Sequence, residues 1–125
     1  MSAEQFRSSL TDDERKGLAT LLNALEPFFG ERQTMPMQLV KSFILAALRE
    51  GEGVTELAKR AGLSQSVMSR HLLDIGDRNR HMEAGFGWTT QHTDPMELRK
   101  HRVVLTPKGT ALAHKVLRAL FGGKR

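Results

Sequence analysis

The polar side chains best suited to recognising a partner lie close together in the stretch SQSVMSR, residues 64–70. Glutamine can pair with adenine edges, arginine with guanine edges and serine with either, if a helix carries them into the major groove of DNA. The plainer alternative is that these side chains only solvate an exposed helix. The candidate base-reading residues are Ser64, Gln65, Ser66, Ser69 and Arg70.

A second group of candidate contacts follows the Asp-Pro pair at positions 94 and 95, a dipeptide that favours a turn. Long cationic side chains just after such a turn can enter a minor groove or hold a phosphate. Glu97 is placed to tether Arg99 across the tip. The alternative is a charged hairpin that meets only water. This group consists of Arg99, Lys100, His101 and Arg102.

The first group needs a helix–turn–helix to present it, and residues 54–75 have the pattern of one. The small residue Ala58 stands where two helices must cross, and Gly62 tolerates the positive φ that the turn requires. Ser64 is placed to cap the second helix. Inward apolar anchors are supplied by Leu63, Met68 and Leu72. The pattern therefore predicts two short helices broken at Gly62, with the base-reading group on the outward side of the second.

The second group needs a hairpin, which the residues around the turn predict. FGWTTQH at 86–92 and KHRVVL at 100–105 favour strands, and TDPMELR lies between them as the turn. Before the first strand, residues 76–87 have glycines at both ends and no sustained period, which indicates a loop. In winged-helix proteins such a hairpin is the wing, a second contact that fixes the angle of the recognition helix on the duplex.

Helical patterns precede and follow this unit. Thr11 and Glu14 have the spacing of a capping box, Pro27 and Gly30 disturb the end of the first pattern, and Pro107 suits a helix start. The expected helices run over 11–29, from Pro36 to before Gly51, and over 106–121. The expected fold is mainly α with a small β-hairpin: one domain over 1–125, with a winged helix–turn–helix at 53–109 flanked by N- and C-terminal helices.

Charge and composition limit the kind of partner. Residues 1–53 carry 6 Lys or Arg and 8 Asp or Glu, a net −2, whereas residues 54–125 carry 13 and 6, a net +7. A basic half on a small domain favours a polyanion such as nucleic acid. The absence of cysteine excludes disulfides, zinc–thiolate sites and cysteine nucleophiles. No apolar run approaches a bilayer span and the N-terminus has no apolar signal core, so we expect a cytoplasmic protein.

The stretches VTELAKRAGLSQSVMSRHL and DPMELRKHRVVLTPKG together resemble the helix–turn–helix and the wing of the MarR family of winged-helix transcription regulators. The wing positions that match are Asp94, Pro95, Glu97, Arg99, Leu105, Thr106 and Gly109, with Glu97 in place of the usual aspartate. The resemblance implies that Arg99 is the wing arginine in the minor groove. It also implies a homodimer on a pseudo-palindromic site and a small-molecule effector, commonly phenolic and of unknown identity here.

Two departures from the family pattern leave alternatives open. The loop at 76–87 is several residues longer than usual, and its Arg78 and Arg80 either add phosphate contacts or cover the base of the wing. One helix follows Thr106 where the family usually has two, so the way in which a dimer forms is open. Apolar residues of the first and last helices either join two subunits or close a monomer core; these are Leu18, Leu22, Leu25, Phe28, Phe29, Leu117, Leu120 and Phe121.

Metal and catalytic sites have little support in the sequence. His71 and Asp74 lie one helical turn apart, but no HExxH and no cysteine pair accompanies them. We therefore expect no metal, no cofactor and no enzymatic activity. His71 is expected to be half-buried or to point at a phosphate. Trp88 and Phe86 are expected to pack against the core rather than stack on bases.

The combined features predict a sequence-specific regulator that binds double-stranded DNA as a dimer. Phosphate contacts from the basic half would supply affinity, and the residues of the recognition helix would supply sequence preference. A rival of another class is a winged helix used as a protein-interaction or assembly module, because a fold does not fix a function. That rival predicts no binding to duplex DNA.

Overall fold

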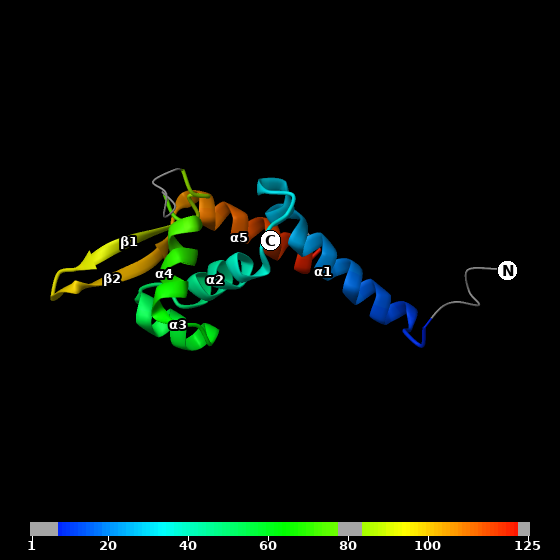
Figure 1. Cartoon of the computed structure of the whole chain (residues 1–125). Helices are drawn as coiled ribbons and strands as arrows, with labels where there is room; N and C mark the ends of the chain where they lie inside the picture. Colours follow the sequence, from blue (N-terminus) through cyan, green and yellow to red (C-terminus); the bar gives the residue numbers. More distant parts are fainter. Residues whose placement is uncertain (1–7, 78–83, 123–125) are drawn as a thin grey trace.

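A computed structural model of the chain describes residues 8–77 and 84–122. Helices α1 and α5 lie side by side, and the β1–β2 hairpin extends away from the opposite end of the molecule, beyond α3 and α4 (Figure 1). This mainly α arrangement with one antiparallel hairpin confirms the expected fold class. The elements are α1 (Asp12–Glu31), α2 (Met37–Leu48), α3 (Val54–Ala61), α4 (Gln65–Asp74), β1 (Thr89–Asp94), β2 (Glu97–Leu105) and α5 (Pro107–Leu120).

Helix α1 begins at the predicted capping box. The Thr11 hydroxyl accepts the Glu14 N–H at 3.0 Å, and the Glu14 carboxylate accepts the Thr11 N–H at 2.8 Å. The helix then continues through Pro27 to Glu31, beyond the predicted end at 29. Ala24 and Phe28, on either side of Pro27, are buried in the core. This tertiary packing holds the helix together where the local sequence disfavours it.

The helix–turn–helix forms as predicted. Gly62 has a φ of 71° in the turn between α3 and α4, and the Leu63 N–H reaches back to the Ala58 carbonyl at 3.0 Å. The Ser64 hydroxyl accepts the Val67 N–H at 3.2 Å and so caps α4. Met68 is fully buried and anchors α4 from below. The outer side of the first turn of α4 is thereby left to solvent.

The first strand begins at Thr89 rather than at the predicted Phe86, both strands extend further toward the tip, and the turn is tighter than predicted. Strands β1 and β2 pair from Thr89 opposite Leu105 to Thr93 opposite His101, and the register then shifts so that Asp94 lies opposite Glu97. The turn expected over 93–99 is therefore wrong in extent, because only Pro95 and Met96 separate the strands. The physical reason is the Asp94 carboxylate, which accepts the Met96 N–H at 2.8 Å and closes the turn locally.

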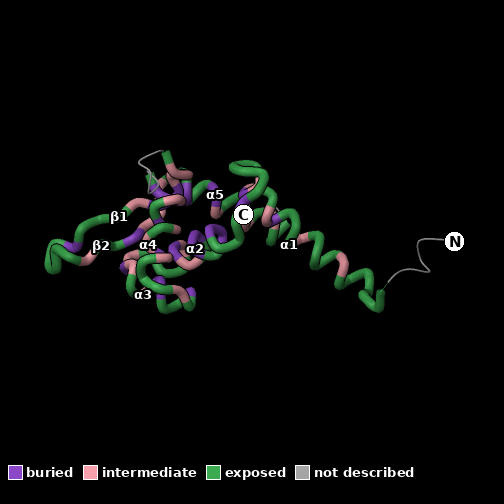
Figure 2. The backbone as a smooth tube through the Cα atoms, in the orientation of Figure 1, coloured by how far each residue is buried: buried purple, intermediate pink, exposed green. Residues whose placement is uncertain are grey.

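An aromatic cluster joins the flanking helices to the root of the wing. Trp88 is fully buried and makes edge-to-face contacts with Phe28 and Phe43, with ring centroids 5.8 and 5.3 Å away; Phe86 stacks on it at 4.7 Å. This confirms the core assignment of Trp88 and Phe86. It also corrects one dimer candidate, because Phe28 is 1% exposed and closes the core of the chain itself. In Figure 2 the buried segments gather between the helices and the base of the hairpin.

Two backbone contacts fix the wing to the rest of the molecule. The Gly51 N–H donates to the Val103 carbonyl and the Val103 N–H donates to the Glu52 carbonyl, each at 2.9 Å. Just after the C-terminal end of β2, a Cβ built on Gly109 would lie 2.0 Å from the Trp88 carbonyl oxygen. The glycine of the Leu-Thr-x-x-Gly stretch is therefore needed for the close approach of α5 to the wing root.

Candidate nucleic-acid interface

A groove of about 560 Å³ runs between the start of α3, the first half of α4 and the wing. It brings together residues from both predicted groups, which are more than twenty residues apart in the sequence. Acidic and neutral residues of α3 and of both strands complete its walls. Those from the predicted groups are Gln65, Ser69, Arg99, Lys100 and His101; among the others are Thr55, Glu56, Gln91 and Glu97.

The predicted recognition residues divide between two sides of α4. Gln65 and Ser69, four residues apart, line the groove beside the wing. Arg70 is exposed on another side, where it lines a separate cavity of about 220 Å³ together with Arg32 of the segment after α1. If α4 bound in the groove of a partner, Gln65 and Ser69 would therefore contact one part of that partner and Arg70 another.

The two serines at the start of α4 have different surroundings. The Ser64 hydroxyl is occupied in capping, and Ser66 is exposed with its hydroxyl 3.3 Å from that of Ser64. Ser64 thus shapes the helix start, whereas Ser66 can turn its hydroxyl outward. Neither serine lines the groove between α4 and the wing.

The break in strand register explains how consecutive wing residues share one groove. In a regular strand, successive side chains point to opposite faces. Arg99, Lys100 and His101 all line the groove, and they follow the point where the pairing shifts between Thr93 and Asp94. Bulges of this kind redirect side chains locally. The irregular end of the hairpin therefore brings three consecutive residues of β2 to the groove beside α3 and α4.

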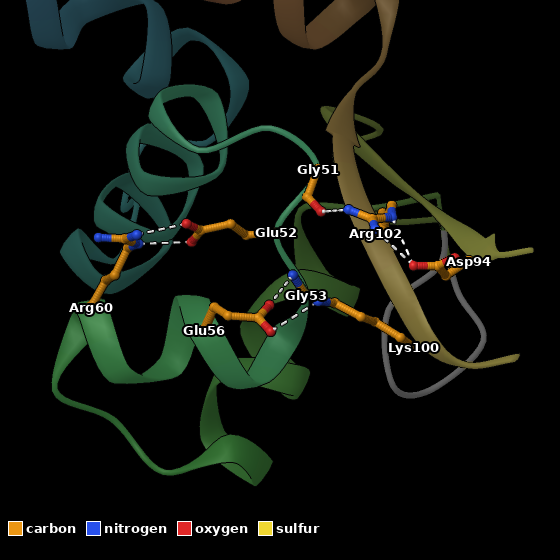
Figure 3. A network of polar contacts seen from close by, with 8 residues as sticks. All are labelled: Gly51, Glu52, Gly53, Glu56, Arg60, Asp94, Lys100 and Arg102. Carbon is orange, nitrogen blue, oxygen red and sulfur yellow. Dashed lines mark hydrogen bonds and ion pairs between the residues drawn. The ribbon is translucent and has the colours of Figure 1, made fainter. Parts of the chain in front are cut away.

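Ion pairs hold two of the four wing residues against the protein (Figure 3). The Arg102 guanidinium donates to the Asp94 carboxylate at 2.7 and 3.1 Å and to the Gly51 carbonyl at 2.9 Å. Lys100 lies 3.3 Å from the Glu56 carboxylate of α3. Within the described residues, Glu97 makes no ion pair with Arg99. The expected tether at the tip is therefore wrong, and Asp94 with Arg102 supplies one instead.

The carboxylates of this region are stabilised in their charged form. The backbone N–H of Met96, with Arg102 beside it, lowers the pKa of Asp94, and the backbone N–H of Gly53, with Lys100, lowers the pKa of Glu56. The Arg60 guanidinium, 2.6 Å from Glu52, lowers the pKa of that residue. These acids are ionised at neutral pH, and the groove therefore contains fixed negative as well as positive charge.

Solved structures with a similar fold include transcription regulators described as MarR family or MarR-like. A MarR-like regulator from Thermotoga maritima matches with a TM-score of 0.61 and 20% identity, over 98% of this chain and 79% of that one. A second MarR family regulator matches at 0.59 and 18% identity over 86% of this chain, which spans 62% of its length. The repressor CouR, solved bound to a 23-mer DNA duplex, matches at 0.52 and 20% identity, over 95% and 77%.

This chain has the MarR fold. No protein-family model and no curated protein matches the sequence, so the likeness lies in the three-dimensional arrangement. The resemblance that the helix–turn–helix and wing motifs indicated is confirmed for the fold. Helices α3 and α4 and the hairpin lie at the positions in the chain that those motifs predicted.

Some residues that line the groove or the cavity beside α4 were not predicted from the sequence. Glu56 is the most important, and its signal was available, because it stands three residues after Gly53 in the position of a capping acid. Gln91 lies on β1 opposite Val103, and Thr55 lies at the start of α3. Arg32 is brought beside Arg70 only by the tertiary fold, and no local pattern indicates it.

The remaining predicted residues are placed as follows. His71 is partly buried as expected, and its Nδ1 is enclosed with no hydrogen-bond partner among the described residues. Arg78 and Arg80 lie outside the described residues. Of the dimer candidates on the two flanking helices, Leu25, Phe29 and Leu117 are partly buried, whereas Leu18, Leu22, Leu120 and Phe121 are exposed.

Among residues 8–77 and 84–122, no group of three or more histidine or acidic side chains is placed to hold a metal ion. The helices of those same ranges include none that is both long and apolar enough to cross a bilayer.

Proposed function

We propose that the protein is a cytoplasmic, sequence-specific regulator of transcription that occupies double-stranded DNA rather than catalysing a reaction. The observation that carries this proposal is the groove in which Gln65 and Ser69 of α4 face Arg99, Lys100 and His101 of the wing. Side chains that read bases and side chains that hold phosphate are thus joined on one surface. The MarR-fold repressor CouR, solved on a DNA duplex, supports the proposal.

In this proposal the two elements have separate roles. Helix α4 enters the major groove, where Gln65 reads an adenine edge and Arg70, on another side of the helix, reads a guanine edge. The wing follows the backbone, and Arg99 reaches the adjacent minor groove. Arg99 is suited to this role because it is exposed and makes no ion pair with any residue that the structure describes.

The rival function, a protein-interaction or assembly module, fits the groove less well. The centres of protein–protein interfaces are depleted in charged residues. This groove instead places Arg99, Lys100, Glu56 and Glu97 around its walls. A charged groove with amide and hydroxyl groups on one side matches the polar, wet character of protein–DNA interfaces better.

Selection of bound sequences from a random duplex pool tests the function directly. Enrichment of one motif is expected, whereas a pool that stays random would favour the assembly module. Binding isotherms of two variants then separate the roles. Arg99→Ala should weaken binding to all sequences and reduce the slope of log K against log salt by about 0.9. Gln65→Ala should instead change the preferred base at one position, at a discrimination of about 1–3 kcal/mol.

We further propose that the protein acts as a homodimer on a pseudo-palindromic site. Leu18 and Leu22 on α1 are each 55% exposed, and Leu120 and Phe121 at the end of α5 are 45% and 53% exposed. Exposed apolar side chains on two packed helices favour association. The selected site should contain two half-sites about 10 base pairs apart, and sedimentation should give twice the chain mass. A monomer protecting a single half-site would refute this part.

The cavity of about 220 Å³ beside α4 is the place that we propose for a small-molecule effector. Arg32 and Arg70 supply positive charge there, Leu39 and Val67 supply apolar contact, and the enclosed His71 Nδ1 has no partner among the described residues. A MarR-fold protein described as MepR-like has been solved with pseudoligands, at a TM-score of 0.50. Small aromatic acids should raise the melting temperature of the wild type more than that of Arg32→Ala; equal shifts would exclude this cavity.

A further inference from the structure

Glu56 places a carboxylate in the groove that faces DNA in the proposed function, on which this inference rests. One carboxylate oxygen accepts the Gly53 N–H at the start of α3, and the other lies 3.3 Å from the Lys100 ammonium of the wing. Figure 3 shows the Glu56 carboxylate on α3 with one contact to the Gly53 N–H and another to the ammonium of Lys100, whose side chain reaches across from β2. Both Glu56 and Lys100 line the groove. Their contact therefore joins α3 to the wing inside the candidate interface.

The position of Glu56 does not depend on Lys100. The hydrogen bond from the Gly53 N–H satisfies a backbone donor at the helix start and fixes the carboxylate there. The surroundings of Gly53 are close-packed, because a Cβ at that position would lie 3.0 Å from the Glu56 carboxylate and 3.2 Å from the His101 carbonyl. The negative charge stays in the groove even if Lys100 moves toward a phosphate.

The ion pair itself is a surface pair that a phosphate can replace. The side chains of Lys100 and Glu56 are 33% and 40% exposed, and pairs so exposed contribute little to stability. The pair nevertheless has no net charge at the surface where the proposed function places DNA. Of the described wing residues, Arg99 has no such counter-ion, and Arg102 is held by Asp94 and Gly51 and does not line the groove.

We propose that Glu56 is an affinity-limiting residue that offsets Lys100 and repels the DNA backbone, so that sequence-independent binding stays weak and base contacts by α4 decide where the protein rests. In sequence-independent binding, affinity comes from neutralised phosphates. A fixed carboxylate in the groove removes about one such contribution while leaving the base-reading side chains Gln65 and Ser69 untouched. The cap to Gly53 keeps this negative charge in one place.

The test is the salt dependence of binding to the selected duplex and to a random duplex. Glu56→Gln keeps an acceptor for the Gly53 N–H, and glutamine is common at this capping position. We expect tighter binding to both duplexes and a slope of log K against log salt steeper by about 0.9. Relative to wild type, the gain should be roughly three-fold larger at about 50 mM than at about 200 mM salt.

Glu52→Gln is the matched control. It removes the same charge from the same segment, but Glu52 pairs with Arg60 and does not line the groove. Its slope should stay near that of the wild type, because the charge that it removes lies outside the groove. The double variant Glu56→Gln/Lys100→Met should also return the slope to the wild-type value, since the pair contributes no net charge in either protein.

Each outcome decides between the claims. An unchanged slope in Glu56→Gln, with wild-type binding intact, would overturn this inference and leave the proposed function standing. A wild type that binds neither duplex would overturn the proposed function and the inference with it. If Glu56→Gln fails to fold, as judged by circular dichroism, Lys100→Met is measured instead. It leaves Glu56 unbalanced and should reduce the slope by about 0.9; no reduction would show that the pair lies away from DNA.

Discussion

The recognition helix α4 and the wing differ in what holds their exposed polar residues. At the start of α4, the contacts are local: the Ser64 hydroxyl accepts the N–H of Val67, three residues later in the chain, and Gln65 lines the groove. In the wing, Lys100 and Arg102 contact residues that are more than forty positions away in the chain, Glu56 and Gly51. The helix therefore presents its side chains by itself, whereas the wing presents them only when α3 and the segment before it are in place.

This difference predicts how substitutions in α4 and in the wing will differ in their effects. Helix α4 is anchored from below by buried residues such as Met68, so a change at its surface should affect recognition without moving the helix. The wing is held at its root by the Gly51–Val103 contact and by the approach of Gly109 to Trp88. A change at that root should move the wing or unfold the chain, although the root residues themselves do not line the groove.

The largest expected effect comes from Gly109→Ala. The added methyl group would lie 2.0 Å from the Trp88 carbonyl oxygen, and this carbonyl also accepts the Thr106 N–H at 3.0 Å. Neither backbone segment can yield without losing that contact. We expect a loss of about 1–3 kcal/mol or more in the free energy of unfolding, measured by urea denaturation, and a melting temperature lower by several degrees.

Gly17→Ala is the matched control for this variant. Gly17 lies inside α1, and a Cβ there would meet no atom within 4 Å. Alanine favours a helix over glycine by about 1 kcal/mol, so this variant should be as stable as the wild type or more so. Equal destabilisation by the two substitutions would mean that the wing root tolerates a side chain, and the contrast between wing and helix would lose its main support.

The same contrast explains what could be predicted from the sequence. The cap at Ser64, the turn at Gly62 and the inward anchors depend on neighbours within one or two helical turns, and all were predicted. The start of α1 was predicted for the same reason, through Thr11 and Glu14. These features are local, and the residue types alone specify them.

Features that depend on distant residues were predicted less well. The partners of Arg102 and Lys100 lie on other elements, so the sequence suggested Glu97 and free cations instead. Phe28 lies on an apolar helical face that the sequence assigns either to a dimer or to the core, and its contacts with Trp88 and Phe43 place it in the core. The extent of the hairpin followed from one side-chain hydrogen bond at Asp94, which propensities do not encode.

A smaller effect is expected at the start of the recognition helix. Ser64→Ala removes the hydroxyl that accepts the Val67 N–H, and loss of such a cap costs about 1 kcal/mol. Ser66→Ala is the control, since Ser66 is exposed and caps nothing among the described residues; its effect should stay within about 0.5 kcal/mol. If both serines proved equivalent in thermal unfolding, the view that α4 is fixed by its own local contacts would be wrong.

The smallest expected effect is at the tip of the wing and depends on pH. The pKa of Asp94 is lowered by the Met96 N–H and by Arg102, so the folded state favours the charged carboxylate. Its contribution to stability is therefore fully present above its ordinary pKa of about 4. It is lost as the pH falls through the lowered value. Asp94→Asn keeps an acceptor for Met96 but loses the charge, and should be slightly less stable than the wild type at neutral pH.

The difference in unfolding free energy between Asp94→Asn and the wild type should shrink to zero in acid. Glu97→Gln at the same tip serves as the control, because Glu97 makes no ion pair with any described residue; its difference from the wild type should not follow this course. Denaturation curves at neutral pH and below pH about 3 decide the matter. A difference that stayed constant with pH would mean that Arg102 does not hold Asp94. The tip would then be held, like α4, by a neutral local hydrogen bond alone.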